Sequence, residues 1–281
     1  MIKVIATDLD GTLFYPKRKL HLISKKNKQF LQNALDSGKE IILVTGRNYR
    51  IATKVEDCLE KKNQLSIVGC NGAFMIHKGE LIEETPMDNE KAYELYEKLS
   101  ELKIVKVWMI FGNDDVMYVD SSNVGPVIRT AGYVGFNLQG AYYEPFVISK
   151  SKTAEFIKNP KNKIYKMMPW FGTGKKGVEK ARLFTEKWNK EHTGNTFTFS
   201  WSGNAIEITD GRVTKAVSLV KLIEKLGYTR EEVAVVGDSG NDVSMFKEFP
   251  NSYCMKHAPL QVQKEAKTII KSFDDLKNYI K

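Results

Sequence analysis

Short apolar runs that alternate with amphipathic helix patterns limit the first part of this chain to one class of fold. Residues 3–7 (KVIAT), 40–44 (EIILV) and 66–69 (SIVG) are too short for helices and rich in β-branched residues, which favours buried strands. Helical periodicity occupies residues 24–37 and 48–61 between them. Strands separated by helices imply βαβ units with right-handed crossovers, and therefore a parallel sheet.

The same alternation returns near the end of the chain. An amphipathic helix pattern over residues 214–227 precedes a strand-like run at 231–237, and another helix pattern begins near residue 241. We therefore expect an α/β fold, a doubly wound parallel sheet built from both ends of the chain.

The middle of the chain has strand patterns that follow one another closely, as in an antiparallel sheet. The strand-like segments there are residues 106–112, 115–120, 163–171, 195–201 and 204–209, and the helical ones are 88–102 and 175–190. Ser202-Gly203 is the expected turn of the last hairpin. We predict an α/β core made of residues 1–83 and 206–281, interrupted by an α+β unit at 84–205.

The composition excludes several classes of protein. With 281 residues, 42% hydrophobic and 27% charged, the chain is typical of a soluble globular protein. No apolar run approaches the roughly 18 to 20 residues that span a bilayer, and the first residues lack the pattern of a signal peptide. Cys58, Cys70 and Cys254 are widely spaced and form no CxxC pair, which indicates a reducing, cytoplasmic location.

The net charge of +9 suits either nucleic acid or phosphorylated small molecules. The lysines are spread along the chain, and no arginine cluster with interleaved aromatic residues occurs. We therefore expect a small phosphorylated metabolite as the partner, with no specific nucleic acid and no membrane. The sequence carries no signal for an oligomeric state.

Polar residues follow three of the predicted strands at the same end of the sheet. They are Asp8 and Asp10 after the first strand, Thr45, Gly46 and Arg47 after the second, and Asp238, Asn241 and Asp242 after the late strand. The carboxyl ends of parallel strands converge on a ligand-binding crevice. Strand alternation would place Asp8 and Asp10 on one side, about 6 to 7 Å apart. Because the acids are accompanied by no histidine or cysteine ligand pattern, they predict a Mg²⁺ site.

Further groups in this crevice would suit an anion. Lys215 begins the helix pattern that precedes the late strand, so its ammonium group could reach the acids. Thr45 offers a hydroxyl, and the backbone amides of Leu9 and Gly46 can donate to an anion. Acids, metal, lysine, hydroxyl and amides together are the equipment of phosphoryl transfer.

These segments resemble, in order and spacing, the four motifs of the haloacid dehalogenase superfamily. They are DLDGTL at 8–13, LVTGR at 43–47, the lysine of RVTKA at 212–216 and GDSGNDVSM at 237–245. The NGA at 71–73 and the insertion between the second and third motifs are similar to the Cof-type class of these hydrolases. The resemblance covers the whole chain, and implies that the inserted α+β unit is a cap that selects the substrate.

The resemblance also implies catalytic roles. Asp8 would be the nucleophile that forms an aspartyl-phosphate, and Asp10 the general acid and then the general base. Thr45 and Lys215 would hold the phosphoryl oxygens.

The metal and substrate contacts follow from the same resemblance. Asp8, the Asp10 carbonyl and Asp238 would ligate Mg²⁺, while Asp242 would support the metal site or Lys215. Asn241 matches a family position near metal and substrate.

Two residues keep alternative interpretations. Arg47 is either a structural salt-bridge partner or a substrate contact, and Asn71 either belongs to a plain turn or places its side chain at the rim of the crevice. Thr214 and Ala216 stand where the family commonly has serine and glycine around its lysine, and Ser239-Gly240 also departs from the common pattern. Neither departure removes a charged group, so both bear on the substrate rather than on catalysis.

Other apparent motifs are interpreted as structural. Residues 172–177 contain GxGxxG, but no parallel βαβ unit surrounds them, so a glycine-containing loop of the cap is expected. The four histidines, His21, His77, His192 and His257, have no ligand spacing and are expected to be surface or structural residues.

We therefore expect a Mg²⁺-dependent phosphatase of small phosphorylated metabolites such as sugar phosphates. A phosphomutase of the phosphomannomutase type is the nearest alternative, because such enzymes resemble the same core and cap. A non-catalytic protein that binds phosphorylated metabolites is the alternative from another class.

Overall fold

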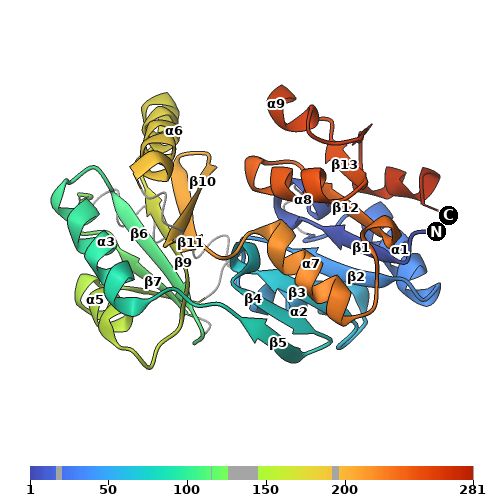
Figure 1. The fold of residues 1–281 in the computed structure, drawn as a ribbon, viewed down its shortest axis with the longest axis horizontal. Coiled ribbons are helices and arrows are strands. Elements are labelled where there is room, and N and C mark those ends of the chain that lie inside the picture. Colours follow the sequence, from blue (N-terminus) through green and yellow to red (C-terminus); the bar gives the residue numbers. More distant parts are fainter. Residues whose placement is uncertain (17–20, 115, 126–144, 192–195, 281) are drawn as a thin grey trace. The chain divides into compact units, whose positions relative to one another are not determined.

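The computed structural model describes residues 1–16, 21–114, 116–125, 145–191 and 196–280. The chain divides into two compact units (Figure 1). The core unit consists of Met1–Glu84 and Thr214–Lys281, and the inserted unit consists of Thr85–Val213.

The core unit is built on an eight-stranded sheet with the order β14-β13-β12-β1-β2-β3-β4-β5. Its strands are β1 (Val4–Thr7), β2 (Glu40–Val44), β3 (Leu65–Gly69), β4 (Phe74–His77), β5 (Glu80–Glu84), β12 (Val233–Gly237), β13 (Asn251–Met255) and β14 (Thr268–Ile270). All neighbours from β14 to β3 are parallel, and β4 and β5 add an antiparallel edge. In the centre, Val4 pairs with Glu40 of β2 and Val233 of β12. The expected doubly wound α/β core is confirmed.

Helices cover the core sheet because each contributes one apolar face. They are α1 (Lys25–Asp36), α2 (Arg50–Leu59), α7 (Lys215–Lys225), α8 (Val243–Glu248) and α9 (Leu260–Gln263), with short 3₁₀ turns η2 (Cys70–Gly72), η3 (Arg230–Glu232), η4 (Gly240–Asp242) and η5 (Phe273–Asn278). Leu219 and Leu222 of α7 and Phe246 of α8 are buried in one cluster with Val4 and Ala6 of β1. Helix α1 packs on β2 of the sheet and against α2 and η5.

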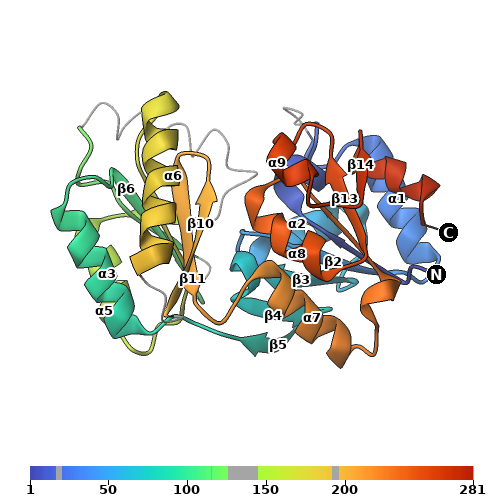
Figure 2. The ribbon, with the colours of Figure 1, turned by 45° about the horizontal axis from the view of Figure 1, so that its top comes forward.

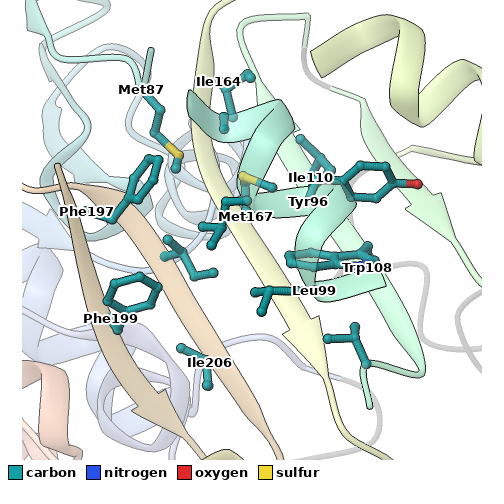
Figure 3. Close-up of a cluster of buried hydrophobic side chains, with 14 of the residues drawn as sticks. Met87, Tyr96, Leu99, Trp108, Ile110, Ile164, Met167, Phe197, Phe199 and Ile206 are labelled. Atoms are coloured by element: carbon teal, nitrogen blue, oxygen red, sulfur yellow. The ribbon is translucent and has the colours of Figure 1, made fainter. Parts of the chain in front are cut away.

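The inserted unit has a six-stranded sheet with the order β10-β11-β9-β6-β7-β8. Its strands are β6 (Val107–Gly112), β7 (Met117–Asp120), β8 (Phe146–Ile148), β9 (Ile164–Trp170), β10 (Phe197–Ser202) and β11 (Ala205–Asp210), and its helices are α3 (Asn89–Glu101), α5 (Lys150–Lys158) and α6 (Gly174–Glu191). Neighbouring strands are antiparallel except for the parallel pair β7 and β8. Figure 3 shows its core, in which Trp108, Ile110 and Met167 pack with Leu99 of α3 and Phe199 of β10.

The predicted boundary at residue 206 is wrong. Strand β11 pairs with both β10 and β9, so residues 206–213 belong to the inserted unit, and a boundary at 206 would cut through this strand. The turn of the hairpin is Gly203-Asn204 rather than Ser202-Gly203, because β10 continues to Ser202.

Local patterns also led to smaller errors. Helix α5 was not expected. The GxGxxG segment follows β9, which is antiparallel to both of its neighbours, so it lies in no parallel βαβ unit. Within the described residues, no helix combines the length and apolar character needed to cross a membrane.

Candidate active site

Asp8 stands directly after β1, the central strand of the core sheet. It is 5% exposed, and its backbone N–H continues the ladder by donating to the Val236 carbonyl at 2.9 Å. The chain then turns sharply through Leu9–Leu13, so the strand alternation expected to align Asp8 with Asp10 does not apply. Asp8 therefore points into the protein, whereas the Asp10 side chain is 46% exposed.

Lys215 is the buried cation that faces Asp8. It is the first residue of α7, whose N-cap, Thr214, accepts from the Val217 N–H through its side chain. The Lys215 Nζ atom lies 2.7 Å from Asp8 Oδ1 and 2.7 Å from Asp242 Oδ1, and the residue is 1% exposed. Lys215 and Asp8 are 207 residues apart in the sequence, and the parallel sheet brings them together.

Asp242 organises the loop after β12. Its Oδ2 atom accepts from the backbone N–H groups of Asp238 and Ser239 at 2.9 and 3.0 Å, while Oδ1 accepts from Lys215. The residue is fully buried. A Cβ at Gly237 would lie 2.4 Å from the Asp242 Cγ atom, so only glycine fits beside this carboxylate. Both carboxylate oxygens of Asp242 are therefore already hydrogen-bonded. Its role is to hold Lys215 and the loop after β12 in place.

Asp8, Asp238 and Asp242 form a cluster of potential metal ligands, with one carboxylate oxygen from each within 4.8 Å of the others. Thr12 Oγ1 donates to Asp238 Oδ1 at 3.1 Å. Gly11 has a φ of +87°, and a Cβ there would lie 2.2 Å from Asp238 Oδ2. Oxygen donors without thiolate or imidazole in the cluster suit a hard divalent cation such as Mg²⁺.

Electrostatics favour a cation at this cluster. Burial raises the pKa of Asp8 well above its usual range, and the Lys215 ammonium opposes this. Burial and the charge of Asp242 raise the pKa of Asp238 to about 6. Burial alone would lower the pKa of Lys215, but the charges of Asp242 and Asp8 outweigh it and raise that pKa. Lys215 therefore stays charged. The raised pKa values of Asp8 and Asp238 reflect burial and repulsion between the ionised carboxylates, which a bound cation would relieve.

Thr45, Gly46 and Arg47 follow β2, next to β1. Thr45 is 1% exposed, and its hydroxyl oxygen accepts from the backbone N–H of Arg47 at 3.1 Å. The Arg47 guanidinium binds both carboxylate oxygens of Asp10. Of the two interpretations of Arg47, the salt bridge is therefore observed.

Asn71, in the turn after β3, and Asn241, in the loop after β12, are brought together. Asn71 adopts a left-handed conformation with φ of 59° and donates its N–H to the Thr45 carbonyl at 2.9 Å. Asn241 Nδ2 donates to Asn71 Oδ1 at 3.3 Å, and Asn71 is 5% exposed. The Leu9 side chain is fully buried, so only its backbone can serve a ligand.

His257 lies next to the site, although the sequence led us to expect a surface or structural residue. Its Nε2 atom lies 3.6 Å from Asp238 Oδ2, and its ring stacks on Tyr15 with centroids 3.9 Å apart. A signal was present, because His257 comes two residues after the end of β13, at the same carboxyl edge of the parallel sheet.

Comparisons with known proteins agree with this architecture. The family model of the haloacid dehalogenase-like hydrolases matches residues 5–277. Pyridoxal phosphate phosphatase YbhA of Escherichia coli is 29% identical over 278 residues, covering 95% of this chain and 93% of that protein. The 5-amino-6-(5-phospho-D-ribitylamino)uracil phosphatase YwtE of Bacillus subtilis is 24% identical over 286 residues, covering 98% and 94%.

Solved structures share the fold. SMU.1108c from Streptococcus mutans aligns with a TM-score of 0.79 at 20% identity, covering 99% of each chain. A haloacid dehalogenase-like hydrolase from Bacillus subtilis aligns with a TM-score of 0.78 at 21% identity, covering 98% of this chain and 96% of that one.

Proposed function

The chain belongs to the haloacid dehalogenase-like hydrolases, and from this we propose that it is a Mg²⁺-dependent phosphatase of small phosphorylated metabolites. The observation that carries the proposal is the buried Asp8 carboxylate, which contacts Lys215 and lies beside Asp238 at the carboxyl edge of the parallel sheet. Two curated relatives, named as phosphatases of pyridoxal phosphate and of a ribitylaminouracil phosphate, support a small phosphorylated substrate.

Asp8 is the proposed nucleophile. One of its oxygens forms a bond to phosphorus as the bond from phosphorus to the leaving oxygen breaks, and Asp10 gives that oxygen a proton. Water then attacks the phosphorus of the aspartyl-phosphate and gives a proton to Asp10. The bond from Asp8 to phosphorus breaks, so inorganic phosphate is released and the Asp8 carboxylate is regenerated. Lys215 and Thr45, with the amides of Leu9 and Gly46, hold the phosphoryl oxygens during both steps.

The acidic cluster fits a magnesium ion. Asp8, Asp238 and the Asp10 carbonyl would hold it, and Asp242 would keep Lys215 and the Asp238 loop in place. Once bound, the ion supplies positive charge that offsets the crowded carboxylates and polarises the phosphoryl group. A Cβ at Gly11 would collide with the Asp238 carboxylate. This close fit supports a site in which Asp238 must hold one position.

We further propose that the inserted unit selects the substrate. All the groups assigned above to the phosphoryl-transfer steps belong to the core unit. The inserted unit is therefore free to select the substrate, as the resemblance to the Cof-type class implies.

The test is a panel of sugar phosphates, nucleotides and pyridoxal phosphate, assayed with Mg²⁺ for inorganic phosphate. We expect release from at least one compound, and a loss of roughly a thousandfold or more in kcat for Asp8→Asn. Asp36→Asn is the control, because Asp36 is an exposed acid of α1 paired with Lys61.

The rival functions give different products. Isomerised sugar phosphate without free phosphate would indicate a mutase. Saturable binding of a compound with no turnover, by wild type and Asp8→Asn alike, would indicate a non-catalytic binding protein. Activity of Asp8→Asn near that of the wild type would contradict the proposed nucleophile.

A further inference from the structure

A pocket of about 430 Å³ lies in the core unit between one face of α1 and the C-terminal segment. Figure 2 shows α1 beside the end of the chain, and α1 packs on η5. Lys26, Phe30 and Ala34 project into it from α1 at a spacing of four residues, so they share one face of the helix. Its volume is within the range of small-molecule sites, and none of the residues of the candidate active site lines it.

Among the charged side chains that line this pocket, cations outnumber acids. Lys26, Lys39 and Lys277 line it, against a single acid, Asp274. Asp274 is already neutralised, because Lys277 Nζ lies 3.2 Å from its Oδ2 atom and Ser272 Oγ donates to its Oδ1 atom at 2.8 Å. The lining therefore carries an excess of positive charge.

Lys26 is the cation best placed to meet a ligand. Lys39 Nζ donates to the Ile2 carbonyl at 2.7 Å, and Lys277 is paired with Asp274. The Lys26 ammonium group, by contrast, has no hydrogen bond or ion pair within the described residues, although its charge acts on Asp274. Burial alone would raise the pKa of Asp274, but its hydrogen bond to Ser272 and the nearby lysines lower it, in keeping with a positive potential.

An apolar wall completes the pocket. Phe30, Ala34 and Ile280 line it together with the lysines. The Phe30 ring is held edge-on against Phe273, with centroids 5.5 Å apart and an interplanar angle of 75°. A ring fixed in this way offers an apolar surface to a second flat group.

We propose that this pocket is a second ligand site of the protein, which binds a small organic anion: a phosphate or phosphonate group on a flat apolar ring. The anionic group meets Lys26 and the other lysines, and the ring lies against Phe30 and Ile280. Lysine binds phosphate as a point charge, so the site recognises charge and an apolar body rather than a particular metabolite.

The experiment is a titration of the full-length ¹⁵N-labelled protein with phenylphosphonate, which cannot be hydrolysed as a phosphate ester, followed by amide chemical shifts. We expect saturable shifts in residues 26–37 and 273–280, separate from any in 8–12 and 238–242. Lys26→Glu should weaken the binding at the first group of residues about tenfold or more, because it reverses the charge of the lysine whose ammonium group has no hydrogen bond or ion pair within the described residues. Methylphosphonate, which lacks the ring, should bind more weakly there.

The matched control is Lys25→Glu, the neighbouring exposed lysine of α1, which does not line the pocket. It should change the affinity by less than about twofold. Equal weakening by both variants would overturn the proposal in favour of nonspecific attraction. Shifts confined to the candidate active site, or no saturable shift, would also overturn it, and equal affinity for the two phosphonates would overturn the role of the apolar wall.

Discussion

The guanidinium group of Arg47 donates two parallel hydrogen bonds to the carboxylate of Asp10, from Nε to Oδ2 at 2.6 Å and from Nη2 to Oδ1 at 2.7 Å. Such a bidentate pair fixes the orientation of a carboxylate. The Asp10 side chain is 46% exposed, so the pair contributes little to folding stability. Its consequence lies in where it holds Asp10, which we propose as the general acid. Because Arg47 contacts both carboxylate oxygens, one of these contacts must open before Asp10 can carry the proton.

Arg47 should therefore act through Asp10. We expect Arg47→Lys, which keeps the charge but loses the fork, to lower kcat for an alkyl phosphate about tenfold, and Arg47→Ala about a hundredfold. The loss should be smaller for p-nitrophenyl phosphate, whose leaving group needs no proton, and thermal stability should be unchanged. Equal losses for both substrates would mean that Arg47 acts on phosphate binding instead.

Gly11 and Gly38 have similar left-handed backbone conformations, so one can serve as the control for the other. Their φ values are +87° and +81°, but a Cβ at Gly11 would lie 2.2 Å from Asp238 Oδ2, whereas at Gly38 it would meet nothing within 4 Å. Each change to alanine should cost about 1 kcal/mol of unfolding free energy for the backbone conformation. Gly11→Ala alone should also lose most of the activity, because Asp238 must move.

Steady-state kinetics and urea unfolding of the two alanine variants check this expectation. Retained activity in Gly11→Ala would show that Asp238 can shift without consequence. A similar loss of activity in Gly38→Ala would point to a general effect of strain.

Asp8 and Asp242 should respond differently to neutralisation in metal-free protein. Burial and the neighbouring acids disfavour the charged form of Asp8, and an amide oxygen could still accept from Lys215, so Asp8→Asn should leave the unfolding free energy nearly unchanged. Asp242→Asn places an amide nitrogen against either Lys215 or the N–H groups of Asp238 and Ser239, and should cost about 3 kcal/mol.

Urea unfolding in the presence of a chelator measures both values. If Asp8→Asn destabilised the protein as much as Asp242→Asn, the two carboxylates would not differ in the way proposed, with the charge of Asp8 disfavoured by its surroundings and that of Asp242 stabilised by its hydrogen bonds.

Magnesium should stabilise the fold through Asp238. At a Mg²⁺ concentration about a hundred times Kd, ligation adds about 2.7 kcal/mol of unfolding free energy, which should raise the melting temperature by about 5 °C. Asp238→Asn should abolish this shift, whereas Asp36→Asn should retain it. The comparison is a thermal melt with Mg²⁺ against one with a chelator, and a full shift in Asp238→Asn would exclude this residue as a ligand.

The cysteines should differ in reactivity. Cys58 is partly exposed, whereas Cys70 and Cys254 are buried. Burial, with the charges of Asp242 and Asp238, raises the pKa of Cys254 to about 12, so at pH 8 only about one in ten thousand of its thiols is the reactive thiolate. Brief alkylation of native protein, located by mass spectrometry, should modify Cys58 first. Rapid labelling of Cys254 would contradict the burial described here.

Much of the fold was predictable because local patterns encode elements. The alternation of apolar runs and helix patterns gave β1, β2, β3 and β12 with their helices, since periodicity and turn residues act within a few residues of each other. The inserted unit was also recognisable, but its end was misplaced because β11 has a buried, strand-like pattern that would suit either sheet. Pairing with β10 and β9 decides which sheet it joins.

For the site, the sequence alone determined which residue types stand at the carboxyl ends of the strands, and so predicted Asp8, Thr45, Lys215 and Asp238 as one group. Their pairing depends on how distant segments of the chain pack together. Lys215 lies between Asp8 and Asp242, Arg47 is committed to Asp10, and His257 stands beside Asp238. The reason is physical: spacing along a chain sets strand and helix faces, but which side chains meet depends on strand order, sharp turns and rotamers, which are settled only when distant segments pack together.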